Sequence, residues 1–101
     1  MYRYTTPTII LNVTNKDFDM EQIEICHVTI KSGNGTEYIC ENPEIDTENK
    51  KIYFTLDQEQ TAAFQTGSIK IQARIKLYNG NVIASGVMRT SMYNVLEETI
   101  L

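Results

Sequence analysis

The sequence that decides the fold runs from residue 68 to residue 81 and reads SIKIQARIKLYNGN. Apolar side chains alternate in it with polar or charged ones, and a period of two is typical of a β-strand with one buried and one solvated face. The buried set is predicted to be Ile69, Ile71, Ala73, Ile75 and Leu77. Asn79-Gly80 is the pair preferred in a type I′ turn, so a further strand, from Asn81 towards Met92, is predicted to return antiparallel.

Shorter alternating segments predict four more strands on the N-terminal side. They are Thr8–Val13, Ile23–Ser32, Thr36–Glu41 and Lys51–Leu56. Glycines on both sides of Asn34 indicate a hairpin between the second and third of these strands, because positive φ costs glycine little. Asn42-Pro43-Glu44 is expected to end the third strand, and residues 46–50 are expected to form a polar loop.

Two short helical segments are predicted between the strands. Asp57 and Gln60 have the spacing of a capping box, which predicts a short helix through Phe64 that Gly67 ends. A turn at residues 14–17 is expected to precede a single helical turn capped by Asp19.

The order of these elements predicts one all-β domain. Short connections and one-sided alternation indicate an antiparallel immunoglobulin-like β-sandwich of about six to seven strands, with a short helical turn before the fifth strand. A small open barrel is the alternative. The last strand loses its alternation around Ser85-Gly86, which predicts a bulge or bend there. The domain is expected to cover residues 1–101, with apolar terminal segments at 1–6 and 93–101.

The composition predicts a self-sufficient core and a negatively charged molecule. The chain has 101 residues, of which 42% are hydrophobic and 22% charged, and its formal net charge is −4. A domain of this size buries enough surface to fold without metal or disulfide staples. The acidic balance argues against binding a phosphate backbone, which needs a basic face, and no apolar run approaches the about 20 residues that span a bilayer. We therefore expect neither a nucleic-acid nor a membrane partner.

Residues for catalysis or metal binding are few. His27 is the only histidine and has no Cys, Asp or second His at ligand spacing, so we interpret it as a surface or edge imidazole. The acidic residues lie in predicted loops and on the tail, spaced like solvated side chains rather than like a pair of catalytic carboxylates. We expect the chain to be no enzyme and to hold no cofactor and no metal.

The two cysteines lie on the two arms of the first predicted hairpin. If its turn centres near Asn34, Cys40 is opposite Val28 and diagonal to Cys26, about 7 Å away, which is at or past the usual limit for a disulfide. The N-terminal residues show no secretion signal. Two reduced, buried thiols are therefore expected, with a disulfide as the alternative.

The chain ends are apolar and aromatic, although termini are normally polar and frayed. The candidate interface residues are Tyr2, Tyr4, Tyr93, Val95, Leu96, Ile100 and Leu101. They predict either contact with a neighbouring subunit, by strand addition or docking in a groove, or a tail that folds back over one open end of the sandwich. Tyr53 and Tyr78, outward by parity, indicate a glycan- or protein-binding surface, or are simply good strand formers.

Several motifs, in their order and spacing, resemble small phage and prophage tail-region proteins of Gram-positive bacteria. These motifs are YTTPTI at 4–9, VTIK at 28–31, FTLDQEQT at 54–61, IKIQARI at 69–75, NGNVIAS at 79–85 and VL at 95–96. Over nearly the whole chain they are similar to the N-terminal β-sandwich domain of phage baseplate upper proteins. In that family the domain attaches to the tail core, and a helical stalk and a distal adhesion part follow it.

The resemblance implies a structural role in the virion, with other virion subunits as partners and with self-association. The expected location is the virion, after synthesis in the cytoplasm of the bacterial host. The stalk and distal part have no counterpart here, so an adaptor role in the tail or baseplate is expected rather than host recognition. The alternatives are a carbohydrate- or host-surface-binding module, a capsid decoration protein, or an unrelated immunoglobulin-like accessory domain.

Overall fold

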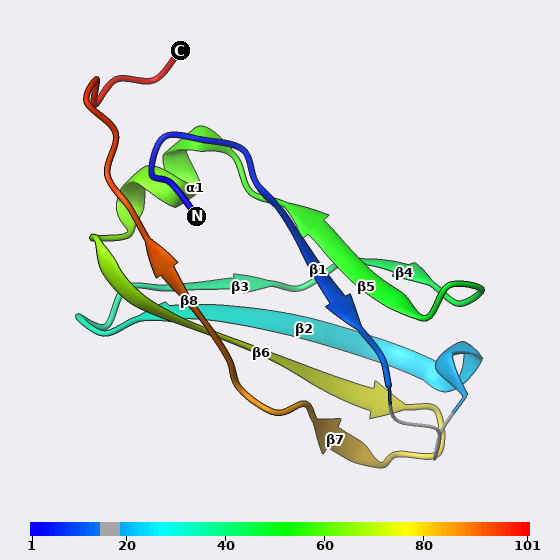
Figure 1. Cartoon of the computed structure of the whole chain (residues 1–101). Coiled ribbons are helices and arrows are strands. Elements are labelled where there is room, and N and C mark those ends of the chain that lie inside the picture. The colour runs from blue at the N-terminus through cyan, green and yellow to red at the C-terminus, as the bar shows by residue number, and fades with distance from the viewer. Residues whose placement is uncertain (15–18) are drawn as a thin grey trace.

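In the computed structural model, which describes residues 1–14 and 19–101, two antiparallel β-sheets pack face to face (Figure 1). The smaller sheet has the order β1-β5-β4, formed by Thr8–Asn12, Lys51–Thr55 and Glu44–Asp46. The larger sheet has the order β3-β2-β6, formed by Glu37–Cys40, Ile23–Ser32 and Gly67–Leu77. The second edge of β6 pairs with both β7 (Val82–Ala84) and β8 (Met88–Met92).

The prediction of an all-β antiparallel sandwich is confirmed, and residues 1–14 and 19–101 form eight strands where about six to seven were expected. β1 pairs with β5, and β2 pairs with β6. These pairs have the places of strands B–E and C–F in an immunoglobulin-like sandwich, with β4 as D, β3 as an extra C′ strand, and β7 with β8 as G. Within the described residues, nothing pairs with the outer edge of β1, where strand A stands in that fold.

One strand was missed by the sequence reasoning, because β4 has a single apolar residue. The polar loop expected at residues 46–50 begins one residue later, because Asp46 is the last residue of β4. The Asp46 carboxylate accepts hydrogen bonds from the backbone N–H of Asn49 at 3.1 Å and from its Nδ2 at 2.8 Å. These bonds lower the pKa of Asp46, and they hold a tight turn in which Lys50 takes a φ of +54°. The turn returns the chain into β5, so that Ile45 pairs with Ile52.

The predicted bend at Ser85-Gly86 is confirmed, and it divides the last strand into β7 and β8. The backbone N–H of Ser85 donates to the carbonyl of Ala73 at 2.9 Å. The Ser85 hydroxyl in turn accepts from the N–H of Ala73 at 3.0 Å. A side-chain oxygen therefore takes the place of a backbone carbonyl in the ladder, which lets the chain leave β6 and rejoin it three residues later.

The type I′ turn predicted at Asn79-Gly80 is wrong. φ is positive at Gly80, at +91°, but not at Asn79, and a type I′ turn requires both. The Gly80 N–H donates to the carbonyl of Leu77 at 2.9 Å, and the Leu77 N–H donates to that of Asn81 at 2.8 Å. This is a type I turn followed by a left-handed glycine. The predicted hairpin around Asn34 has the same geometry, with Gly35 at φ +95°.

Both short helical segments form where their caps predict them. In α1 (Gln58–Ala63) the Asp57 carboxylate and the Gln60 side chain complete the predicted capping box. The 3₁₀ helix η1 (Met20–Gln22) is capped by Asp19, which accepts from the Glu21 N–H. The prediction that Gly67 ends the helix is wrong, because Gly67 begins β6 with a φ of +125°. Apart from Thr14, the turn predicted at 14–17 lies outside the described residues.

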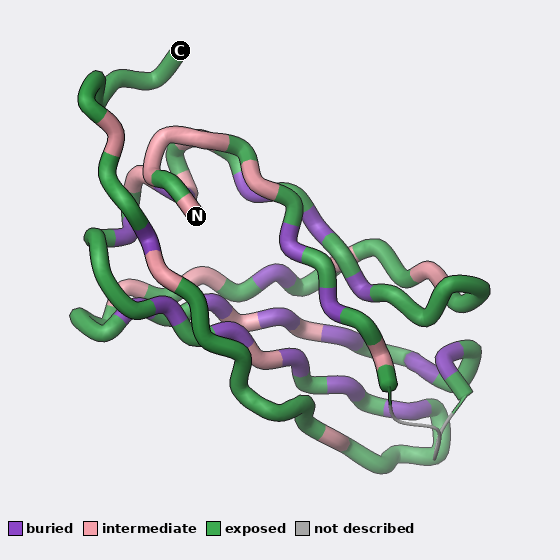
Figure 2. Tube along the Cα trace, viewed as in Figure 1, coloured by how far each residue is buried: buried purple, intermediate pink, exposed green. Residues whose placement is uncertain are grey.

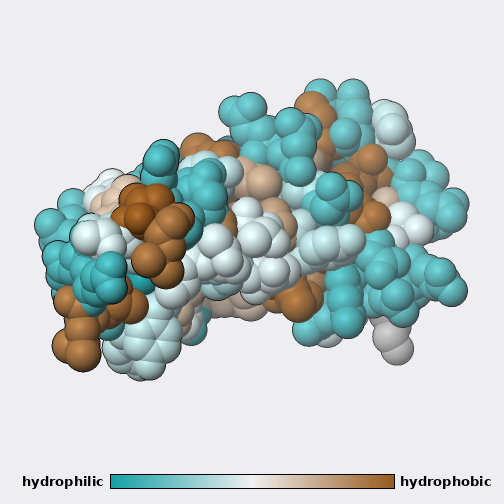
Figure 3. Space-filling model, turned by 90° about the horizontal axis from the view of Figure 1, so that it is seen from above, coloured by the Kyte–Doolittle hydropathy of each residue, from teal (hydrophilic) through white to brown (hydrophobic). Residues whose placement is uncertain are grey.

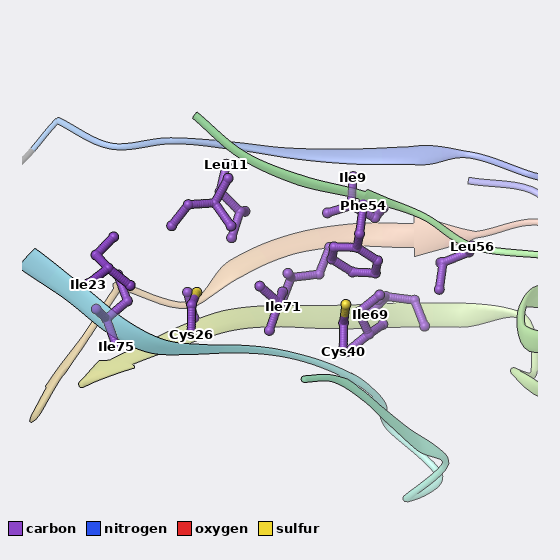
Figure 4. Close-up of a cluster of buried hydrophobic side chains, with 14 of the residues drawn as sticks. Ile9, Leu11, Ile23, Cys26, Cys40, Phe54, Leu56, Ile69, Ile71 and Ile75 are labelled. Carbon is purple, nitrogen blue, oxygen red and sulfur yellow. The ribbon is translucent and has the colours of Figure 1, made fainter. Parts of the chain in front are cut away.

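The core fills the space between the two sheets with the inward residues of each (Figure 2). Figure 4 shows side chains from both sheets pointing towards one another. All five predicted inward residues of β6 are buried, and so are the alternating residues of β1, β2 and β5: Ile9, Leu11, Cys26, Val28, Ile30, Ile52 and Phe54. The pairing of Val28 with Cys40 confirms the predicted register of the first hairpin.

Replacing Ile71 by Ala is expected to lower the free energy of unfolding by about 2–5 kcal/mol, because the lost methyl groups leave a cavity in the core. The matched control is Lys76→Ala, in the same strand but on its exposed face, which is expected to change that free energy by less than about 0.5 kcal/mol. Urea titration followed by circular dichroism measures both. Equal losses would contradict the assignment of the two faces of β6.

Candidate assembly surface at the chain ends

Both ends of the chain lie at the same end of the sandwich, beside α1 (Figure 1). Tyr2 and Tyr93 form a parallel β-bridge. The Tyr93 N–H donates to the carbonyl of Met1 at 2.8 Å, and the Arg3 N–H donates to that of Tyr93 at 2.9 Å. The first three residues therefore pair with the chain just beyond the end of β8. Tyr4 follows at a φ of +59°, and this left-handed residue turns the chain towards β1.

Arg3 joins the N-terminal segment to α1 and to the C-terminal tail. Its Nη2 donates to the carbonyl of Ala62 at 2.8 Å, and its Nη1 donates to Asn94 Oδ1 at 3.1 Å. The same guanidinium is 3.8 Å from a Glu98 carboxylate oxygen and 5.3 Å from the centre of the Tyr4 ring. The sequence reasoning missed Arg3, although it is the only charged residue before Lys16.

Thr61 is a second residue that the sequence reasoning missed. It lies in α1 and is fully buried, and its hydroxyl donates to the carbonyl of Thr5 at 2.8 Å. The same oxygen accepts from the Thr5 N–H at 3.1 Å. One buried hydroxyl thus satisfies both backbone groups of Thr5 and fixes the N-terminal segment against the helix. Its position four residues after the cap Asp57 gave no sign of that role.

Several apolar and aromatic side chains near the two chain ends are exposed to solvent. We call this set the terminal patch: Tyr2, Tyr93, Leu96, Ile100 and Leu101. The rings of Tyr2 and Tyr93 are 5.4 Å apart, and Leu96 is 108% exposed, as far as a side chain can be. Figure 3, which looks down on the smaller sheet, shows hydrophobic residues exposed at this end of the molecule, and others further along it. Tyr4 and Val95, the other candidates, are half-buried beside the patch.

The N-terminal residues and the C-terminal tail differ in how they pack. Residues 1–5 and Tyr93 pair with one another and cover one end of the sandwich. The tail beyond Asn94 returns to α1 through one side chain only: Gln58 accepts from the Leu101 N–H at 2.8 Å and donates to the Leu101 carbonyl at 3.1 Å. The apolar side chains of the tail are left without a place in the core.

A groove of about 440 Å³ opens along the side of the sandwich, between the edge of β1 and the bend that separates β7 from β8. Its walls are mainly apolar and include Leu11, Val13, Ile83 and Met88. It lies where an immunoglobulin-like fold carries strand A, so the edge of the core is accessible there.

The tyrosines do not gather on a single face. Tyr53 and Tyr78 are exposed, as predicted, but Tyr53 lies on the outer face of the smaller sheet and Tyr78 follows the end of β6. Tyr38 packs against the core, 6.4 Å from the Phe54 ring. Among the described residues, the one pair of exposed tyrosines in contact is Tyr2 with Tyr93, whose rings are tilted by 43° to each other.

Cys26 and Cys40 are both buried and both free. Figure 4 places them apart, on the neighbouring strands β2 and β3. Burial in the core, and to a smaller extent the neighbouring Cys40, raises the pKa of Cys26 to about 11. A thiol in this position stays protonated at neutral pH and is a poor nucleophile.

His27 lies on the outward face of β2, paired with Arg74, as the parity of the strand predicts. Among residues 1–14 and 19–101, no group of three or more His, Cys, Asp or Glu side chains is arranged to hold a metal ion. In the same part of the chain no helix is long and apolar enough to cross a membrane.

In comparisons with known proteins, no family model, no curated protein and no solved structure matches this chain.

Replacing Thr61 by Val is expected to lower the free energy of unfolding by about 1–3 kcal/mol, because the shape is kept while both backbone groups of Thr5 lose their partner. Thr66→Val, an exposed threonine just after the helix, is the control and should be near neutral. Thermal unfolding by calorimetry measures the two. A neutral Thr61→Val would show that the N-terminal segment is not fixed through this hydroxyl.

The raised pKa of Cys26 predicts a loss of stability in alkali. The folded state holds this proton up to about pH 11, while an ordinary thiol releases it near pH 9, so the unfolded state is favoured increasingly between these values. The urea concentration at the midpoint of unfolding should therefore fall as the pH is raised from about 8.5 to about 10.5. It should fall less steeply in Cys26→Ala. If the urea midpoint falls equally steeply in both proteins, the pKa of Cys26 is not raised in the folded state.

Proposed function

We propose that this chain is a phage virion structural protein, an adaptor or assembly module of the tail or baseplate that acts through protein–protein contacts. The phage assignment comes from the motif resemblance to the N-terminal domain of baseplate upper proteins. The single observation that supports an assembly role is the terminal patch, in which a folded chain end presents apolar side chains that its own core does not use.

Energetic considerations favour a partner for this patch. Each exposed leucine or isoleucine that becomes buried contributes about 1.5–3 kcal/mol, and Leu96, Ile100 and Leu101 stand close together on one short segment. An isolated exposed leucine is ordinary on a protein surface, but an extended apolar tail is not.

The alternatives remain a glycan- or host-surface-binding module and a capsid decoration protein. A glycan site is favoured by aromatic side chains on one shallow surface, and the exposed tyrosines of the two sheets lie apart from one another. A decoration protein needs the same kind of assembly contact as a tail protein. The terminal patch therefore supports assembly in either part of a virion better than it supports ligand binding.

Deleting residues 95–101 is expected to leave a folded domain and to abolish the higher assemblies of the full-length protein, measured by multi-angle light scattering. Tyr93 and Asn94 are kept, because they pair with Met1 and Arg3. The melting temperature should change little, since the deleted side chains are mostly exposed. The control is Ile10→Ser, which removes an exposed apolar residue from the outer face of β1.

Two results would contradict the self-assembly part of this proposal. Unfolding of the truncated protein would show that the tail belongs to its own core. A strictly monomeric full-length protein would show that another subunit supplies the contact. The virion assignment has a separate test, because mass spectrometry of purified phage particles from the host should detect the protein in stoichiometric amounts. Its absence from particles would overturn the assignment.

A further inference from the structure

The outer face of the larger sheet is basic, although the protein as a whole is acidic. The register places Lys31 opposite Lys70, and Lys70 opposite Arg89, so three cations stand in one row across β2, β6 and β8. Further along the same face of β6 are Arg74 and Lys76. These five residues make up more than half of the 9 Lys and Arg in the chain. The net charge of −4 therefore conceals a cationic sheet face.

Apart from Glu37 of β3, which stands opposite Lys31, the register pairs no carboxylate with these five cations, and none of them forms a salt bridge within the described part of the molecule. Like charges directly opposite one another in a sheet are destabilising. The one salt bridge among residues 1–14 and 19–101 is that of Arg3 with Glu98, at the other end of the protein. An anionic partner on this face would relieve the repulsion, and the face would also steer such a partner towards it.

One place on the basic face also has an apolar floor. A hollow of about 190 Å³ lies near the end of β6, which we call the β6 hollow. It is lined by Ile25, His27, Arg74, Ile75, Lys76 and Val82. Ile25 and Val82 are the exposed apolar residues on either side of Lys76, at 43% and 56% exposure. The hollow thus combines an apolar pocket with a cationic rim.

The C-terminal tail has the complementary chemistry. Leu96 is fully exposed and is followed directly by Glu97 and Glu98, which are exposed carboxylates. The tail is held to its own chain only by exposed polar contacts, among them the Glu98–Arg3 pair at 3.8 Å and the hydrogen bonds of Leu101 with Gln58, and contacts of this kind are weak. An apolar side chain beside two carboxylates fits an apolar pocket beside an arginine and a lysine.

The tail cannot reach the β6 hollow of its own chain. Met92 pairs with Gly67, whereas the hollow lies at Arg74 to Lys76, seven to nine residues further along β6. At about 3.3 Å per residue, that is about 23–30 Å. Leu96 is four residues from Met92, which is at most about 14 Å of extended chain. The tail and the hollow lie towards opposite ends of a molecule 47 Å long (Figure 1).

We propose that the tail of one copy docks in the β6 hollow of a second copy, with Leu96 between Ile25 and Val82 and with Glu97 and Glu98 against Arg74 and Lys76. This inference rests on the proposed assembly function and names its partner as a second copy of this chain. The contact joins unlike surfaces, so it is head-to-tail and leaves one tail and one hollow free at each step. Such an interface builds a ring if the rotation between copies closes, and an open filament if it does not.

Charge reversal on each side of the contact tests it in the full-length protein. The hollow variant carries Arg74→Glu and Lys76→Glu, and the tail variant carries Glu97→Lys and Glu98→Lys. Each alone brings like charges together and should weaken self-association at least about tenfold, as measured by sedimentation velocity. Mixing the two variants pairs opposite charges again and should restore association. Raising the salt concentration should weaken the assemblies of the wild type and of the mixture alike.

Matched controls separate this contact from an effect of net charge. Lys50→Glu with Lys51→Glu changes the net charge as the hollow variant does, and Glu44→Lys with Glu48→Lys changes it as the tail variant does. All four residues are exposed and lie in or beside the β4–β5 hairpin, away from the hollow and from the tail. Both controls should associate like the wild type. Circular dichroism checks that each variant is folded, and the tail variant tests the contact even if the hollow variant is not.

The remaining outcomes each overturn the proposal in a distinct way. If deletion of residues 95–101 disrupts assembly but neither charge reversal does, the tail docks elsewhere and the assembly function stands. If the wild type is monomeric at every concentration, self-association fails, and the virion assignment depends on the particle analysis alone. If a labelled oligonucleotide or heparin binds the wild type and not the hollow variant, without self-association, the basic face serves a polyanion instead.

Discussion

The structure depends on the burial of one face of β6. This strand is paired along both edges, with β2 on one side and with β7 and β8 on the other, and its five inward residues pack against the smaller sheet. The period of two forces the alternate residues, among them Lys70, Arg74 and Lys76, onto the opposite face. The same alternation that builds the core therefore also builds the cationic surface. A one-residue slip would bury three charges, so the register is strongly specified.

At the end of the sandwich where β6 begins, the pairing of β8 with β6 determines where the two chain ends lie. β8 reaches Gly67 there, and the chain continues into Tyr93, which pairs with the N-terminal residues instead of with β6. Arg3 and Thr61 then fix that N-terminal segment to α1. The backbone N–H and carbonyl of Tyr93 are hydrogen-bonded to the N-terminal residues, and the residues that follow Asn94 extend into solvent. The exposure of the tail is thus a result of how the sandwich is closed at this end.

Strong local patterns in the sequence predicted the elements that they control directly. The alternation of Ile69 to Leu77, the capping pair Asp57 and Gln60, and the glycines around Asn34 each act over a few residues, and each forms as predicted. β4 was not predictable in this way, because Ile45 is its one apolar residue and its turn depends on the side chain of Asp46. The conformation of Asn79 was also misjudged, since the same Asn-Gly pair fits a turn with a single left-handed residue.

The candidate site was predictable in composition but not in arrangement. The apolar residues of the tail were visible in the sequence, whereas the roles of Arg3 and Thr61 depend on contacts about 60 to 90 residues apart along the chain. The cationic face was hidden for a different reason. Net charge sums over the whole molecule, and only the register between β2, β6 and β8 shows that Lys31, Lys70 and Arg89 stand together.

The central claim is that the tail beyond Asn94 is held only by exposed polar contacts in a single copy, and that it becomes buried on another copy. Hydrogen–deuterium exchange of the full-length protein, compared between dilute and concentrated samples, tests it most directly. The amides of residues 95–101 should exchange rapidly when dilute and become protected when concentrated, together with those around Ile25 and Val82 at the β6 hollow, while Ile69 to Leu77 stay protected throughout. Protection of the tail in the dilute monomer, or its absence in the concentrated sample, would contradict the account.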